Sequence, residues 1–224
     1  MDQKSSQLES LEPETSNLFP RLNPWLSIWT QPRATIQQII DSGCAKYILL
    51  LVMISGVNST LDRAVSKSMG DDKEVLVIVA MSIATGALSG VFFWALGSAA
   101  TRLIGKWLGG VGTYEELRTA IAWSNVPSVL SLMLWVPLIA IAPNEIFATN
   151  TPTINANTIK SVLYWGIMTI QLVLGIWSLI LMIKCVAQVQ EFSFWRAFSN
   201  LLLAGVALVV PVGIAIAIAI GLGK

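Results

Sequence analysis

Residues that could catalyse a reaction or bind a metal are scarce in this chain of 224 residues. Histidine, the commonest general base and metal ligand, is absent. Cys44 and Cys185 cannot complete a structural zinc site by themselves, and unpaired thiols are favoured over a bridge between them. The acids Glu115 and Glu116 stand at a predicted helix start, where negative charge suits the helix dipole. We therefore expect no enzyme, no catalytic residues, no metal site and no cofactor.

Polar residues next to or within apolar segments are the other candidates for chemistry. Gln171 and Asn125 are amides expected deep in an apolar environment, and Asn125 is placed to satisfy backbone groups that Pro127 frees. Asn58 and Asp62 stand near the end of an apolar segment. They form either part of a polar pocket or a helix end whose side chains reach lipid head groups. The helix end is the favoured interpretation.

Five apolar segments must position these residues. A membrane-spanning helix needs about 20 mostly apolar residues, and burying one charge at its centre costs roughly 2.5–3.5 kcal/mol. Charged residues make up only 12% of the chain, against about 25% in soluble domains. The sequence predicts an all-α, polytopic membrane helix bundle with five transmembrane helices plus a short N-terminal interfacial amphipathic helix. The spans cover about residues 47–66, 75–101, 119–142, 161–184 and 197–222.

The last of these segments contains a pattern that in water would indicate a strand. Ile214, Ile216, Ile218 and Ile220 alternate with alanine. In lipid, an isolated strand would leave its backbone polar groups unpaired, at a cost of several kcal/mol each. We therefore predict a helix there, kinked by Pro211.

The second segment carries a helix-packing motif. Gly86 and Gly90 have the small-xxx-small spacing that lets two helices approach closely. Packing within one copy of the chain is favoured over dimerisation.

The segment before the first span is predicted to form a short amphipathic helix. Pro32 suits its first turn, and Ile36 lies on its apolar face, opposite Gln37. Trp25 and Trp29 precede it. A helix lying in the head-group plane is the favoured interpretation, and a docking face for a soluble partner is the alternative.

A second informative segment connects the second and third spans. Gly109 and Gly110 form a flexible turn, and Thr113 followed by Glu116 has the spacing of a capping box, which predicts a helix start. Glu115 adds a second acid there. Together with the N-terminal segment, these positions are the predicted partner-binding residues: Trp25, Trp29, Pro32, Ile36, Gly109, Gly110, Glu115 and Glu116.

The basic residues predict the orientation in the membrane. Nine of the 14 Lys and Arg residues fall on the N-terminal side of the predicted spans and five on the other side. The positive-inside rule then places the N-terminus in the cytoplasm and the C-terminus outside. We expect a disordered cytoplasmic tail over residues 1–22, the interfacial segment over 23–45 and the membrane domain over 46–224. The acidic start of the chain argues against a secretory signal. In a prokaryote the location would be the cell (inner) membrane.

Three segments resemble the Yip1 domain family of five-span membrane proteins. They are NPWLSIWTQPRATIQQII, WLGGVGTYEELRTAIAWSNVP and IWSLILMIKCVAQVQEFSFWRAF. The resemblance implies a cytoplasmic N-terminus and an outside or lumenal C-terminus. Eukaryotic members act in vesicle traffic and bind prenylated Rab-type GTPases, so such a GTPase is a partner implied by resemblance alone. The short tail is more similar to that of the compact prokaryotic members.

Two functional classes follow from these observations. The first is a non-enzymatic membrane organiser or adaptor, embedded in the lipid bilayer, that recruits a membrane or cytoplasmic protein at the cytoplasmic face. The alternative is a transporter or lipid-handling protein with a polar path within the bundle. A net charge of +1 gives no reason to expect nucleic-acid binding. Charge-free span interiors lack the ionisable residues that transporters usually place at mid-membrane, which favours the adaptor.

Overall fold

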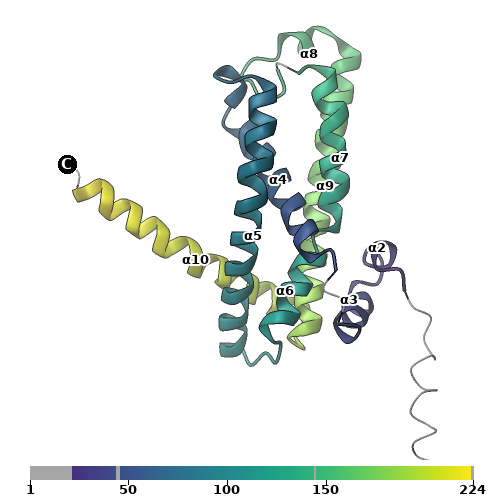
Figure 1. The fold of residues 1–224 in the computed structure, drawn as a ribbon, viewed down its shortest axis with the longest axis vertical. Coiled ribbons are helices and arrows are strands. Elements are labelled where there is room, and N and C mark those ends of the chain that lie inside the picture. The colour runs from purple at the N-terminus through teal and green to yellow at the C-terminus, as the bar shows by residue number, and fades with distance from the viewer. Residues whose placement is uncertain (1–21, 44–45, 144, 223–224) are drawn as a thin grey trace, which may run out of the picture.

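The structure is a computed structural model that describes residues 22–43, 46–143 and 145–222, with side chains described as far as Val210. This described part is helical and contains no strand, as predicted. Long helices form an elongated bundle, with α8 at one end and α2 and α3 at the other (Figure 1). We call these the α8 end and the α3 end. The elements in chain order are α2 (Pro24–Ser27), α3 (Pro32–Asp41), α4 (Ile48–Ser66), η2 (Met69–Asp71), α5 (Val75–Trp107), α6 (Tyr114–Trp123), α7 (Val126–Ile141), α8 (Pro152–Ala156), α9 (Thr158–Val189) and α10 (Phe194–Leu222).

Four helical segments within the described residues are long and apolar enough to cross a membrane. They are α4, α5, the pair α6–α7 and α9, and they coincide with the first four predicted spans. α4 has 19 residues, or about 29 Å at 1.5 Å per residue, which matches a hydrocarbon core of about 30 Å. α5 and α9 have 33 and 32 residues. They therefore extend past the predicted spans; α5 carries Lys106 near its C-terminal end, and α9 carries Lys160 and Lys184 toward its two ends.

The last apolar segment is helical but packs differently from the prediction. α10 runs continuously from Phe194 to Leu222 through Pro211, whose side chain lies outside the described part. Its first turns bury Ala197, Asn200 and Ala204 against the bundle. After Ala204 its described residues are not buried, and α10 points away from the other helices (Figure 1). The apolar stretch within the described part ends at Val210, so a fifth span stays a prediction.

The third predicted span, over residues 119–142, is broken close to its start, as expected from Pro127. α6 ends at Trp123 and α7 begins at Val126, which puts Pro127 in the first turn of α7. The Asn125 side chain donates to the carbonyl of Ile121 over 2.7 Å. It thereby satisfies a carbonyl whose helical partner, the Asn125 N–H, bonds to Ala122 instead.

α4 and α5 approach each other at three glycines. A Cβ on Gly86 would lie 2.7 Å from the Cα of Val57, and a Cβ on Gly90 would lie 2.9 Å from the Cα of Gly56. A Cβ on Gly56 would overlap the carbonyl oxygen of Gly86. The glycine pair of α5 therefore faces α4 of the same chain, where a backbone surface without side chains allows the contact.

The α8 end is closed by contacts between its two connecting segments. Asp71 accepts hydrogen bonds from the Thr149 hydroxyl at 2.6 Å and the Thr149 N–H at 2.9 Å. The side-chain bond and then the backbone bond lower the pKa of Asp71 below its usual 3.8. The N–H of Gly70 donates to the carbonyl of Phe147 over 2.7 Å, and the ring of Phe147 stacks on Trp135. These bonds hold the two segments together over the end of the bundle.

Candidate functional site

The N-terminal helices α2 and α3 are docked against the bundle. Ile28 and Ile36 are fully buried and Ile39 nearly so, in a cluster that includes Leu117 of α6 and Val186 of α9. The helix α3 covers the segment where an amphipathic helix was predicted, and Pro32 lies in its first turn. Its apolar face, however, is covered by the chain itself.

This docking corrects part of the predicted partner-binding set. Pro32 and Ile36 are buried and therefore not available to a soluble partner or to lipid. The physical reason is that α6 and α9 extend to the α3 end and offer apolar side chains there. The apolar face of an amphipathic helix is stable when it is buried against other apolar side chains, and here those side chains come from α6 and α9 of the same chain.

Trp25 and Trp29 stabilise the docked segment by ring packing and a hydrogen bond. The ring of Trp25 packs edge-on against Trp123 of α6, with centroids 5.4 Å apart, and against Tyr47 at 5.6 Å. Trp29 donates its indole N–H to the carbonyl of Trp25 over 3.0 Å. Both are only partly exposed, so they serve first as packing residues of this chain.

Polar contacts complete the docking and leave one face free. The Gln38 side chain bonds to both the N–H and the carbonyl of Leu22, each at 2.9 Å. Gln188 of α9 donates to Gln37 over 3.3 Å. The exposed side of α3 carries Arg33, Gln37 and Asp41.

The glycines between α5 and α6 are needed for close packing. Gly109 has a φ of +77°, which ends α5. A side chain on Gly110 would overlap Gln190, and a Cβ on Gly112 would lie 2.7 Å from Val189. The Gln190 side chain accepts a hydrogen bond from the Gly112 N–H at 3.1 Å. The prediction of a flexible turn at Gly109 and Gly110 therefore gives way to a packed one.

The two acids at the start of α6 have different roles. Thr113 and Glu116 form the predicted capping box, with the Thr113 N–H donating to Glu116 over 2.8 Å and the Glu116 N–H donating to the Thr113 hydroxyl over 3.3 Å. Glu115 is exposed. Both acids line a groove of about 400 Å³ beside Ile40 of α3 and Arg118 of α6. Of these two acids, Glu116 caps the helix, whereas the side chain of Glu115 takes no part in the cap.

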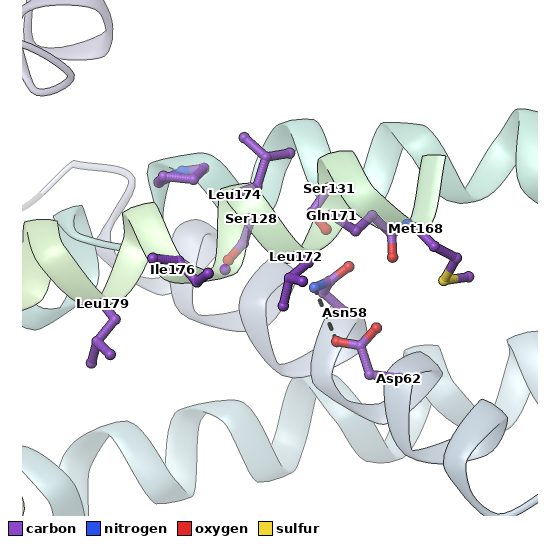
Figure 2. Close-up of a pocket in the computed structure, with 12 residues that line it drawn as sticks. Asn58, Asp62, Ser128, Ser131, Met168, Gln171, Leu172, Leu174, Ile176 and Leu179 are labelled. Carbon is purple, nitrogen blue, oxygen red and sulfur yellow. Dashed lines mark hydrogen bonds between the residues drawn. The ribbon is translucent and has the colours of Figure 1, made fainter. Parts of the chain in front are cut away.

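A second hollow lies between α4, α7 and α9. It has a volume of about 500 Å³, and its lining includes Asn58 and Asp62 of α4 and Gln171 of α9 (Figure 2). Asn58 donates to the Asp62 carboxylate over 3.5 Å and accepts from the Trp135 indole N–H over 2.9 Å. The pocket, which the sequence offered as the less favoured interpretation of Asn58 and Asp62, exists in this structure.

Sequence reasoning missed several residues of this pocket. Ser128 and Ser131 of α7 line it together with Pro127, and Gly175 and Met168 line it from α9. Four-residue spacing could have indicated some of them, because residues i and i+4 share a helix face. Ser131 follows Pro127 and Gly175 follows Gln171 at that spacing.

The two predicted deep amides do not meet. Asn125 accepts a hydrogen bond from the Ser55 hydroxyl at 2.9 Å and lines a different hollow, beside Gly90 of α5. Gln171 lines the pocket between α4, α7 and α9. A single polar path through both is not formed by the described side chains.

Comparison with known proteins identifies the family. The model of the Yip1 domain matches residues 26–217. The chain belongs to the Yip1 family. No curated protein and no solved structure matches it.

The Yip1 match includes both candidate sites. It begins within α2 and ends within α10, so the docked α3, the groove at Glu115 and the pocket at Asn58 all belong to the Yip1 domain. Together with the long apolar helices, the match shows a polytopic membrane protein. Yip1 proteins are generally non-enzymatic membrane proteins linked to membrane trafficking.

Proposed function

We propose that this Yip1-family protein is a membrane-embedded adaptor that recruits a protein partner at its α3 end, on the cytoplasmic face. The proposed orientation rests on the excess of Lys and Arg on that side of the spans. The proposed domain organisation is unchanged: a cytoplasmic tail over residues 1–22, the segment 23–45, and a five-span membrane domain over 46–224.

The observation that carries this proposal is the docking of α3. Burial of Ile28, Ile36 and Ile39 against α6 and α9 fixes the helix on the bundle, so its polar side is presented in one orientation. A surface held in place costs less ordering entropy on binding than a mobile tail does. We define the α3-end surface as Arg33, Gln37, Asp41 and Glu115, all of them exposed.

The chemistry of this surface fits a protein partner. It combines charges of both signs with a groove of about 400 Å³ that has apolar walls at Ile39 and Ile40. Protein interfaces pair an apolar centre with a polar, charged rim in this way. A Rab-type GTPase is one class of partner, on family resemblance alone.

Charge reversal tests the adaptor role. Glu115→Lys and Arg33→Glu change the α3-end surface, and Asp72→Lys is the control at the α8 end, where Asp72 is also exposed. A partner identified by crosslinking the wild type in native membranes should be recovered about tenfold less with the first two variants, which corresponds to about 1.4 kcal/mol. Recovery should be unchanged with Asp72→Lys. Equal recovery from all four proteins would count against the adaptor.

The pocket between α4, α7 and α9 favours lipid handling as a second candidate function. It is lined by polar side chains on one part and leucine and isoleucine side chains on another, a combination suited to an amphipathic molecule. Lipid flux in proteoliposomes should fall in Gln171→Leu and persist in Thr169→Val, an exposed position on the same helix. Equal flux in protein-free vesicles would contradict transport.

A further inference from the structure

The pocket between α4, α7 and α9 changes character along its length. Asp62 lies one turn from the end of α4, at the α8 end of the bundle, and Asn58 lies one turn deeper. On α9, which starts at the α8 end, the lining runs from Met168 through Gln171 to Leu179. Figure 2 shows Leu172, Ile176 and Leu179 leading away from the polar group along α9. The side chains of Asn58, Asp62 and Gln171 therefore lie nearer the α8 end than those of Ile176 and Leu179, although Met168 at that end is apolar and Ser128 in the first turn of α7 is polar.

The polar part presents a carboxylate that lacks a cation. Within the described residues Asp62 accepts one hydrogen bond, from Asn58 at 3.5 Å, and forms no ion pair. The neighbouring Arg63 lines a different hollow, beside Gly90 and Phe93 of α5. Asp62 is exposed near this end of α4, so its carboxylate is open to pairing with a group from outside the chain. A cationic group of a ligand would provide that pairing.

The same pocket contains a hydrogen-bond donor without a partner among the described residues. The Nε2 of Gln171 is buried and has no hydrogen-bond partner. Burying such a donor without a partner is unfavourable. Ser131 adds a hydroxyl from α7. These donors match the phosphate or ester oxygens of a ligand whose cation lies at Asp62.

The apolar part has space for a chain. Gly175 lines it, and a Cβ built on Gly175 has no atom within 4 Å. Leu172, Ile176 and Leu179 are at least one-third exposed on this side of α9. An acyl chain lying there would cover these side chains as the rest of the bilayer does, while its head group stays at the polar end.

We propose that this pocket binds a phospholipid whose head group carries a primary ammonium, as phosphatidylethanolamine does. The ammonium pairs with Asp62, the phosphate or ester oxygens accept from Gln171, and one acyl chain lies along Gly175 and Leu179. This proposal names the ligand of the second candidate function, but it requires binding alone and no movement of lipid. It is independent of the α3-end surface.

Native mass spectrometry of the delipidated full chain tests the proposal. The probes are phosphatidylethanolamine, phosphatidylcholine and phosphatidylglycerol with identical acyl chains, and water-soluble glycerophosphoethanolamine. Wild type should bind phosphatidylethanolamine about tenfold more tightly than the other two lipids and should not retain the soluble head group. Equal affinity for the three lipids, or retention of the soluble head group alone, would overturn the proposal.

Two matched pairs of variants locate the site. Asp62→Asn should remove the preference for phosphatidylethanolamine, and Asp72→Asn, an exposed acid outside the pocket, should keep it. Gly175→Leu should weaken binding of every lipid to this site, whereas Gly166→Leu should not, because Gly166 has equally open space but does not line the pocket. All four positions are exposed. If Asp62→Asn binds lipids like Asp72→Asn, or Gly175→Leu like Gly166→Leu, the placement of the lipid is wrong. Lipid flux is measured separately, so loss of transport with retained binding contradicts only the transport function.

Discussion

The indole N–H of Trp135 on α7 donates a hydrogen bond to the Asn58 side chain on α4 over 2.9 Å. Trp135 is almost fully buried and stacks on Phe147, with ring centroids 5.6 Å apart and planes 6° apart. One tryptophan therefore links α4, α7 and the connection that follows α7. The bond also orients Asn58, whose other amide atom points at Asp62.

Breaking this bond should destabilise the bundle measurably. Asn58→Leu leaves the buried indole N–H of Trp135 unpaired, and we expect a loss of about 1 kcal/mol in the free energy of unfolding. A double-mutant cycle with Trp135→Phe, followed by unfolding in mixed micelles, should give a coupling energy of about 0.6 kcal/mol, typical of membrane-protein hydrogen bonds. Strictly additive effects would show that the bond contributes nothing.

Two glycines of α5 allow a test of its packing against α4, because one lies at the contact and the other does not. Gly86→Ala places a Cβ 2.7 Å from the backbone of α4, so we expect a loss of about 1–3 kcal/mol from overpacking. Gly97→Ala is the control, because a Cβ there has no neighbour within 4 Å and alanine favours a helix by about 1 kcal/mol over glycine. Thermal unfolding should therefore shift in opposite directions for the two variants. A shift of the same size and sign in both would refute the close contact.

The capping box separates the two acids of α6. Thr113→Ala removes the acceptor for the N–H of Glu116, and we expect a loss of about 1 kcal/mol. Glu115→Gln should change stability by much less, because Glu115 is exposed and has no part in the cap. Chemical unfolding of the two variants checks this prediction. Comparable losses in both would mean that the charge of the first turn matters more than the cap.

The closure of the α8 end should depend on pH through Asp71. Hydrogen bonds from Thr149 lower the pKa of Asp71 below 3.8, so the ionised form stabilises the folded state. This contribution is complete above pH 3.8 and is lost as the pH falls through the lower, folded-state pKa. The difference in melting temperature between wild type and Asp71→Asn should therefore shrink in that acidic range. A difference that stays constant from neutral pH into this range would contradict the role of Asp71.

Much of the helical framework was predictable from local pattern. Apolar segments with few or no charges located the four long helical segments, and Thr113, Glu116 and Pro127 located the start and the break of the third. These features depend on residues within a few positions of each other along the chain. Backbone hydrogen bonding in lipid leaves the helix as the one choice for such segments.

The rest required contacts between distant segments. The apolar face of α3 was predictable, but the identity of its cover was not, because Leu117 and Val186 lie far away in the sequence. The pocket could not be assigned because it needs Asn58, Ser131 and Gln171 from three different helices. Gly56 is similarly unremarkable in sequence until α5 places Gly86 opposite it. The direction of α10 depends on where its fully buried residues end, at Ala204.

Site-specific photocrosslinking in native membranes tests the central claim, that the α3-end surface recruits a protein partner. A photoreactive residue replaces Arg33 or Glu115 on that surface, or Asp72 or Thr153 at the α8 end, all of which are exposed. The adaptor function predicts one discrete crosslinked product of increased mass from Arg33 and Glu115, absent from Asp72 and Thr153. Crosslinks to lipid alone from the α3 end, or the same protein product from both ends, would contradict it.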